Sequence, residues 1–538
     1  MVSESDLMKE CCGFFELPFN KQLEFNEAAL KEHLQIWAQT EPAKVICPKG
    51  FNSVDAIPIT TYNDYPGLLK LKSDIERLEK TSPRLPGELA WDYYERIGRV
   101  AAKSVSNYII GDFSFITKTT GTTGEPKWIV HGTLFWEHFR LNALAVIMLS
   151  CSDSWGSTRF RIGDKGLNFT PSAPYLSGWG RKATQGILTD VPPVEMMDNI
   201  ADTRRRFFVA LEYLEKGHSV DFVGGIAPSI YLMCEYFSKP EDLFKEYYSS
   251  VNMGPAKLYL FQKWMQSKIS RRSRNIKDFL KLKGLILSGV DTSLYRDYLM
   301  TKLGIEPYCA YSSTELGTVM FGSPERKNEL FPNLRSFYFE FMDESGELKK
   351  ITELKKGRVY NLIATSFGSI FTKYNTEDMF KVVDIRDDGM PIFSFWGRRK
   401  ATLIINKIPW HVTEALATEV MSKAGLSLSD KWAFSKTLEG GDEKLLILME
   451  NTWNLTIPEA EKRIFEALSN VNPELRHLIK ESGTQEPQEI IKVEYLRRGA
   501  FLRYSMKKAK EGQPLGQIKP PKIIPSERQE LCEILRGV

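Results

Sequence analysis

Apolar residues recur along this chain with two different periods, and each period predicts a different kind of element. Helical spacing predicts amphipathic helices over residues 29–38, 136–149 and 204–217. Dense runs of aromatic and β-branched residues predict strands over residues 337–342 and 358–364. Helices and strands are therefore interleaved, which predicts an α/β fold.

The chain is long enough for more than one domain. Its 538 residues exceed the size at which a single hydrophobic core stops growing. We expect a large N-terminal domain of sheets flanked by helices, residues 1–397, and a small α/β C-terminal domain, residues 398–538. The elements predicted in the smaller domain are helices over 413–424 and 458–468 and strands over 444–449 and 490–495.

A threonine- and glycine-rich stretch lies between two strand-like runs and ends in a lysine. Glycines let backbone N–H groups approach phosphate oxygens, hydroxyls donate further hydrogen bonds, and the lysine neutralises charge. It is not a Walker A loop, because Pro126 separates the last glycine from Lys127 and a strand follows instead of a helix. A plain surface loop is the alternative interpretation. The predicted phosphate-binding residues are Thr119, Thr120, Gly121, Thr122, Thr123, Gly124 and Lys127.

This stretch resembles the phosphate loop of the adenylate-forming superfamily, Ser/Thr-Ser/Thr-Gly-Thr-Thr-Gly-x-Pro-Lys. That superfamily includes acyl-CoA synthetases, peptide-synthetase adenylation domains, firefly luciferase and the acyl-acid amido synthetases. The resemblance implies that a carboxylate is joined to the α-phosphate of ATP, that pyrophosphate leaves, and that the acyl group passes to an amine or a thiol.

Further motifs follow in the order of that superfamily. A buried strand ends at Ser288 and Gly289, which we expect to bind the nucleotide, and a second motif places a glutamate after a tyrosine and three hydroxyl residues. The resemblance implies that the tyrosine lies near adenine, that the hydroxyls approach the α-phosphate, and that the glutamate binds Mg²⁺, a cation that prefers oxygen ligands. A solvated acid beside a turn is the alternative. This second motif is Tyr311, Ser312, Ser313, Thr314 and Glu315.

A third motif, residues 374–378, ends in Asp378. One carboxylate can accept hydrogen bonds from two vicinal hydroxyls, and the resemblance implies that Asp378 binds the ribose. Glu377 stands where the superfamily usually has glycine, which supplies backbone freedom that glutamate lacks, so the conformation of the local turn is open and Glu377 is interpreted as a loop carboxylate.

A strand followed by a basic turn ends at Gly397 and Arg398. The resemblance implies a hinge here, with Arg398 contacting ribose or phosphate and the C-terminal domain moving between adenylation and transfer positions. The aspartate that usually follows Gly-Arg is absent, so two residues, Arg399 and Lys400, are candidates for the pivot of the domain movement. A solvated cluster of cations is the alternative.

Near the C-terminus, residues 516–522 resemble the Gln-Tyr-Lys-x-Pro-Arg segment of the acyl-acid amido synthetases. This register makes Lys519 the adenylation lysine and Lys522 the cation that follows it, and a solvated tail is the alternative. Residues 57–65 also resemble the amido-synthetase branch, whereas residues 121–124 and 171–178 look closer to phenylacetate-CoA-ligase-like enzymes.

The acyl-acid pocket is expected between the phosphate loop and Tyr311. Small residues beside aromatic ones suit a closed, mostly apolar pocket for an aromatic or apolar carboxylic acid, although the same residues could pack the core. The predicted substrate-binding residues are Tyr175, Ser177, Gly178, Gly225 and Pro228.

Composition excludes several other classes of protein. A net charge of +4 over this length does not indicate a nucleic-acid partner, and the basic run 268–274 is interpreted as a solvated segment. Seven cysteines without a CxxC pair indicate reduced thiols and a cytoplasmic protein. The longest apolar run, 143–149, is too short to span a membrane, and the N-terminus does not resemble a signal peptide.

The sequence thus predicts an ATP- and Mg²⁺-dependent ligase that activates a carboxylic acid as an acyl-adenylate. Lys519, Arg398 and Lys127 are the predicted catalytic residues. Two acceptors stay open, an amino acid giving an amide, which the 516–522 segment favours, and coenzyme A giving a thioester. A nucleotide-binding regulator that has lost turnover is the alternative from another class.

Overall fold

The structure is a computed structural model, and it describes residues 3–119, 126–198, 200, 203–238, 276–278, 280–288, 292–398, 402–405, 410–426, 431–439, 442–471, 476, 479, 486–510, 518–524 and 528–537. Several residues named above lie outside these ranges, as does the basic run 268–274. They are Thr120, Gly121, Thr122, Thr123, Gly124, Gly289, Arg399 and Lys400.

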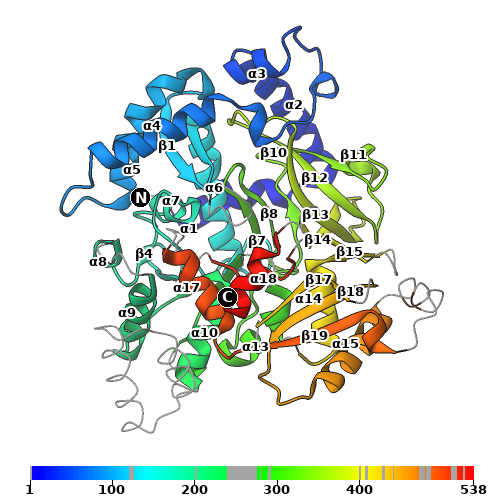
Figure 1. The fold of residues 1–538 in the computed structure, drawn as a ribbon. Helices are drawn as coiled ribbons and strands as arrows, with labels where there is room; N and C mark the ends of the chain where they lie inside the picture. Colours follow the sequence, from blue (N-terminus) through cyan, green and yellow to red (C-terminus); the bar gives the residue numbers. More distant parts are fainter. Residues whose placement is uncertain are drawn as a thin grey trace.

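An antiparallel hairpin packs against two of the helices from the first part of the chain. The hairpin consists of β1 (Phe113–Lys118) and β2 (Trp128–Gly132), and α5 (Ala90–Ala101) and α4 (Gly67–Thr81) pack against it (Figure 1). The other helices of this region are α1 (Glu4–Cys12), α2 (Phe19–Trp37) and α3 (Glu41–Ile46), with 3-10 turns at Gly13–Glu16, Val54–Ala56, Tyr62–Asp64 and Ala102–Tyr108.

A seven-stranded sheet follows, in the order β4-β3-β5-β6-β7-β8-β9. It is parallel from β4 to β7, and β8 and β9 are antiparallel additions. Parallel strands place their carboxyl ends at one edge, so the ends of β6 and β7 meet there. The strands are Lys165–Asn168 (β3), Thr189–Asp190 (β4), Phe222–Ile226 (β5), Gly284–Ser288 (β6), Tyr308–Ser313 (β7), Gly317–Phe321 (β8) and Phe331–Pro332 (β9).

Helices connect and cover the strands of this sheet. The buried helix α6 (Thr133–Ser150) packs against β6 and β8, and α10 (Ala227–Ser238) packs against α13 (Thr292–Leu303). The remaining helical elements here are α7 (Leu176–Ala183), α8 (Val194–Asp198), α9 (Thr203–Glu215) and a 3-10 turn at Ile276–Asp278.

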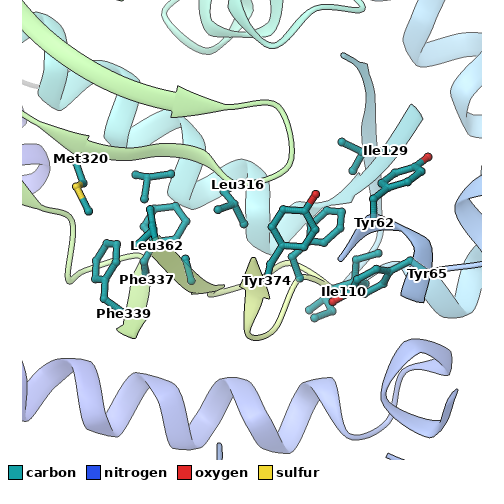
Figure 2. Packing of buried hydrophobic residues seen from close by; sticks show 14 of the residues in the cluster. Tyr62, Tyr65, Ile110, Ile129, Leu316, Met320, Phe337, Phe339, Leu362 and Tyr374 are labelled. Atoms are coloured by element: carbon teal, nitrogen blue, oxygen red, sulfur yellow. The ribbon is translucent and has the colours of Figure 1, made fainter. Parts of the chain in front are cut away.

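An antiparallel five-stranded sheet, in the order β11-β10-β12-β13-β14, completes the larger part of the chain. One buried cluster joins this sheet to the helices around the hairpin, and Tyr62, Tyr65 and Tyr374 lie near one another in it (Figure 2). The strands are Phe337–Met342 (β10), Leu348–Lys350 (β11), Val359–Ser366 (β12), Tyr374–Ile385 (β13) and Pro391–Arg398 (β14), with a 3-10 turn at Ile351–Glu353.

The C-terminal part forms its own sheet, β17-β18-β19, beside the β15-β16 pair. The buried apolar clusters of this part contain only residues from Leu403 onward, whereas the large cluster of the preceding part ends at Phe393. The C-terminal part therefore has its own hydrophobic core. Figure 1 shows this sheet below the five-stranded one. The elements are Thr402–Ile405 (β15), Trp410–Thr413 (β16), Glu414–Lys423 (α14), Trp432–Glu439 (β17), Asp442–Glu450 (β18), Ile457–Val471 (α15), Pro487–Glu489 (3-10), Ile491–Leu496 (β19), Ala500–Lys510 (α17) and Glu530–Arg536 (α18).

The predicted α/β class is confirmed. The helix predicted over 136–149 is α6, the strand predicted over 337–342 is β10, and the helix predicted over 413–424 is α14 with Thr413 as its N-cap. Within the ranges that the structure describes, no helix is both long enough and apolar enough to cross a membrane.

Two buried histidines make stability depend on pH. Burial lowers the pKa of His33 and of His131 to about 3, whereas an unfolded histidine titrates near 6.5. Below that value the unfolded state binds protons that the folded state does not. Stability is therefore lost as pH falls from about 6.5 toward about 3, by roughly 1.4 kcal/mol per pH unit for each histidine.

The pH effect is tested with His131→Gln, which removes one titrating ring and keeps a group that can bond to Thr117, the partner of His131 at 2.8 Å. In urea denaturation between pH 6 and pH 4, the slope of unfolding free energy against pH is expected to be shallower by about 1.4 kcal/mol per unit than in wild type. Equal slopes would show that His131 is protonated in the folded state.

Candidate active site

Two hydrogen bonds join Thr119 and Lys127, the described residues at either end of the predicted phosphate loop. The Thr119 amide donates to the Lys127 carbonyl at 2.9 Å, and the Lys127 amide donates to Thr119 Oγ1, also at 2.9 Å. These residues lie at the ends of β1 and β2, which pair up to Lys118 and Trp128. Thr119 and Lys127, at the two ends of this stretch, are therefore held together.

The Lys127 side chain faces a carboxylate from another strand pair. Its Nζ lies 3.5 Å from Oε1 of Glu315 and 5.0 Å from the centroid of the Tyr62 ring. The Tyr374 hydroxyl donates to the same Glu315 oxygen at 3.2 Å. Burial, and then the charge of Glu315, raise the pKa of Tyr374, so its phenol stays a donor.

The turn between β7 and β8 positions Glu315. The Ser313 hydroxyl accepts the Leu316 amide at 3.2 Å, and the Ser312 hydroxyl donates to Thr318 Oγ1 at 3.2 Å. Gly317 closes the turn at a φ of 84°, a conformation that glycine adopts without a steric penalty. Thr314 lies in this turn beside Glu315.

Tyr311, earlier in the same motif, contacts Asp378. Its hydroxyl donates to Asp378 Oδ2 at 2.6 Å, and its ring packs edge-on against Phe380 at 4.9 Å. Asp378 is opposite Arg398 in the register of β13 and β14. The structure does not describe the Arg398 side chain. Asp378 is thus placed between the tyrosine and the backbone of the predicted hinge arginine.

Local side chains build the turn before Asp378. The Glu377 amide donates to Asn375 Oδ1 at 2.9 Å, and the Asp378 amide donates to Thr376 Oγ1 at 3.1 Å. Between them Glu377 has a φ of 59°, the left-handed conformation that favours glycine. Glu377 is therefore a strained residue in a glycine-like turn, which answers the question that the sequence left open.

Substitutions at Glu377 test this strain. Glu377→Gly is expected to change the unfolding free energy by less than about 1 kcal/mol, because relief of strain offsets the greater entropy of the unfolded chain. Glu377→Val is expected to lower it by about 2 kcal/mol, since a β-branched residue is poorly accommodated at positive φ. Urea denaturation measures both, and equal stability of the two variants would contradict the assignment.

The predicted substrate-binding residues were expected on loops but lie at the start of α7 and at the junction of β5 with α10, and packing accounts for some of them. The Ser177 hydroxyl donates to the Pro171 carbonyl at 3.1 Å. A Cβ on Gly178 would lie 2.0 Å from the Ala173 amide nitrogen, so this glycine lets α7 approach the preceding loop. Tyr175 precedes α7, Gly225 lies in β5, and Pro228 lies in α10. Their role in substrate binding stays a prediction.

Ser288 ends β6 beside this region, and its hydroxyl donates to the Gly225 carbonyl at 3.5 Å. This hydrogen bond places Ser288, a predicted nucleotide-binding residue, next to Gly225, a predicted substrate-binding residue. The two are parallel neighbours, β5 and β6.

The two C-terminal lysines have different surroundings. Lys522 is 4% exposed, and its ammonium lies 4.0 Å from the centroid of the Trp432 ring. Its carbonyl accepts the Phe434 amide at 2.7 Å, which attaches the segment to the edge of β17. Lys519 is half-buried, just beyond the anchored Ile518. Lys522 therefore packs within the C-terminal part, whereas Lys519 is more accessible, and the role of either lysine in adenylation stays a prediction.

Solved structures with similar architecture cover almost the whole chain. A structure described as GH3.15 acyl acid amido synthetase has a TM-score of 0.62 and 16% identity, covering 96% of this chain and 93% of its own. A second, AtGH3.15 acyl acid amido synthetase in complex with 2,4-DB, has a TM-score of 0.64 and 17% identity, covering 98% and 96%. The chain has the fold of the acyl acid amido synthetases.

The prediction of an adenylate-forming fold is thereby confirmed. A 2-hydroxyisobutyryl-CoA ligase with 2-HIB-AMP and CoA also matches, with 14% identity over 88% of this chain and 87% of its own, but its TM-score of 0.44 is too low to establish a shared fold. No protein-family model matches the sequence, and no curated protein matches it. The amido-synthetase fold is thus recognised from structure at a level of identity where sequence comparison fails.

Within this amido-synthetase fold, sequence reasoning missed Tyr62 and the hydroxyl of Tyr374. Tyr62 belongs to the 57–65 stretch, which resembles the amido-synthetase branch, and that resemblance is a signal that could have pointed to it. The Tyr374 hydroxyl reaches Glu315 across 59 residues of sequence, a separation that no local pattern reports.

Proposed function

We propose that the protein is an ATP-dependent ligase that activates a carboxylic acid as an acyl-adenylate and transfers the acyl group to the amine of an amino acid. The main support is the meeting of Lys127, Glu315 and Tyr374 at the mouth of the phosphate loop. The same two motifs also join through the contact of Tyr311 with Asp378. A cation, an oxygen ligand and a ribose-binding carboxylate are what adenylation of ATP requires.

In the first step a carboxylate oxygen of the acid attacks the α-phosphorus of ATP. The bond from that phosphorus to the bridging oxygen breaks, and pyrophosphate leaves. Lys127 and the loop amides would stabilise the added charge, Asp378 would accept both ribose hydroxyls, and Arg398 and Lys519 would orient the α-phosphate. No serine or cysteine nucleophile is needed, because the substrate supplies its own.

In the second step the amino group attacks the acyl carbon. A carbon–nitrogen bond forms, the bond from the acyl carbon to the phosphate oxygen breaks, AMP leaves, and the amine loses a proton. The proposed 398–538 domain would change position between the steps, which would remove Lys519 from the site after adenylation.

Glu315 is the residue that would hold Mg²⁺. Its side chain is 14% exposed at the mouth of the phosphate loop, and in the described residues there is no cluster of three or more metal-binding side chains. This donor set fits Mg²⁺, which takes one or two carboxylates and completes its shell with phosphates and water. When bound, the ion would neutralise charge on the phosphates.

The compartment we propose is the cytoplasm. All seven cysteines lie in the part of the chain that the structure describes, all are buried, and none of them forms a disulfide. Burial raises the pKa of Cys11 to about 11, so the thiol stays protonated at neutral pH. Reduced cysteines fit a compartment that does not form disulfides.

One assay tests the proposal and identifies the acceptor. The protein is incubated with ATP, Mg²⁺, a panel of aromatic and apolar acids that includes 2,4-DB, an amino-acid mixture and coenzyme A, and products are resolved by mass. We expect AMP, pyrophosphate and an acyl–amino-acid amide in equal amounts. If a thioester forms in place of the amide, the protein is a CoA ligase. If no acid in the panel leads to pyrophosphate release, the protein does not carry out adenylation.

A further inference from the structure

A short segment before the hairpin contacts both halves of the site. The Thr60 amide donates to the Lys373 carbonyl at 2.9 Å, and the Asn375 amide donates to the Thr60 carbonyl at 2.8 Å. Thr60 thus forms an isolated parallel bridge with Tyr374, the first residue of the motif that ends in Asp378.

The Thr60 side chain adds a second attachment to the same loop. Its Oγ1 donates to the Thr372 carbonyl at 2.9 Å and lies 3.0 Å from the Tyr65 hydroxyl. Thr60, Tyr65 and Thr372 are 1%, 0% and 0% exposed. A buried carbonyl that loses its donor is costly, so the Thr60 hydroxyl has a defined energetic role.

Two residues further on, Tyr62 contacts the other half of the site. Its hydroxyl donates to the Trp128 carbonyl at 2.9 Å, next to Lys127, and its ring lies 5.0 Å from the Lys127 ammonium. Figure 2 shows Tyr62 beside Ile129 on one side and near Tyr65 and Tyr374 on the other. Residues 60–62 therefore span from residues 372–378, here called the nucleotide loop because they end in Asp378, to Lys127 at the end of the predicted phosphate loop.

The loop that Thr60 holds is strained at both ends. Lys373 has a φ of 47° and Glu377 a φ of 59°. Non-glycine residues keep such conformations only where their surroundings over-determine them, at a cost of about 1–3 kcal/mol each. At the Lys373 end, the contacts of Thr60 with Thr372, Lys373 and Asn375 add to the restraint from the Lys373 amide bond to Thr365 and the buried ion pair with Glu340. At the Glu377 end, the side chains of Asn375 and Thr376 supply it.

We propose that Thr60 and Tyr62 are positioning residues, which set the distance between Asp378 on the nucleotide loop and Lys127 on the phosphate loop. This inference rests on the proposed function. Thr60 acts through the backbone of the nucleotide loop, and Tyr62 acts through Trp128 and Lys127. A small displacement of such groups is sufficient to reduce ATP binding and turnover.

Thr60→Val tests the first contact, because valine keeps the shape and loses the hydroxyl. We expect the KM for ATP in pyrophosphate release to rise about 10-fold, and amides in a peptide covering 366–380 to exchange hydrogen about 10-fold faster. Thr60→Ser restores the hydroxyl and is expected to restore both. Thr40→Val is the matched control, since Thr40 is also buried and bonded, at the start of α3; it should lower stability without changing either readout.

Tyr62 is tested with a pair of variants. Tyr62→Phe keeps the ring under Lys127 and loses the bond to the Trp128 carbonyl, whereas Tyr62→Leu loses both. The KM for ATP is expected to rise about 3-fold in the first and about 10-fold in the second. This pair also decides the matter if Thr60→Val does not fold.

The outcomes separate this inference from the proposed function. If wild type releases no pyrophosphate with any acid, the proposed function fails, and the hydrogen-exchange comparison of Thr60→Val with Thr40→Val still tests the restraint. If wild type is active and Thr60→Val matches Thr40→Val in both KM and exchange, Thr60 has only a structural role. If both Tyr62 variants also keep the wild-type KM, the inference is overturned.

Discussion

Asp378→Ala is expected to slow acyl-adenylate formation by about 10²- to 10³-fold, the scale observed when one preorganised polar contact to the reacting complex is removed. Asp378 is 6% exposed at the end of the nucleotide loop, and it accepts a hydrogen bond from the Tyr311 hydroxyl. Single-turnover pyrophosphate release with saturating acid measures the effect. Circular dichroism is expected to show a folded protein, because Asp378 is not part of the apolar core.

The matched control is Tyr311→Phe, which removes the hydroxyl that donates to Asp378 and leaves the carboxylate in place. Its effect is expected to be less than about 10-fold. Lys127→Ala, by contrast, should resemble Asp378→Ala, and Lys127→Arg should recover part of the activity because it keeps the charge. Near wild-type pyrophosphate release in both alanine variants would remove these residues from the site.

The second large effect is expected for Lys519→Ala. If this lysine acts only in adenylation, the substitution should slow acyl-adenylate formation by about 10²-fold. Amide formation from a supplied acyl-adenylate should be nearly unchanged, since the lysine would then be outside the site. Comparing the two half-reactions by rapid quench distinguishes this from general damage, which would slow both.

Lys522→Ala is the control for that experiment. Its ammonium is buried over the Trp432 ring, so the substitution is expected to lower the unfolding free energy by about 2 kcal/mol and to leave adenylation by the folded protein unchanged. If Lys522→Ala abolished adenylation and Lys519→Ala did not, the proposed register of the 516–522 segment would be wrong.

Elements dominated by local pattern were predictable from the sequence. The strand over 337–342 coincides with β10, because Phe337, Phe339 and Phe341 repeat at the spacing of a strand and a turn follows. The helix over 29–38 was found only in its second half, since α2 starts at Phe19, directly after Pro18. Polar and charged residues dilute the apolar spacing in that first half.

The order of the motifs along the chain also predicted which of them would lie together in space, but it did not predict the contacts that hold them in place. Glu315 and Lys127 were assigned to one site and lie 3.5 Å apart. Nothing in residues 57–65 indicates that Thr60 pairs with a loop 312 residues away. The left-handed φ of Glu377 likewise depends on Asn375 and Thr376, whose hydrogen bonds become visible only in three dimensions.

The attachment of residues 522–524 to β17 has a consequence for how the lysine near it would work. Phe434 bonds on both sides of Ile523, to the carbonyl of Lys522 and the amide of Ile524. Lys519 therefore lies only a few residues before a segment that is hydrogen-bonded to β17. The position of Lys519 would follow the orientation of the whole β17-β18-β19 sheet. A single rotation of that sheet would then be sufficient to bring the lysine to the α-phosphate or to remove it.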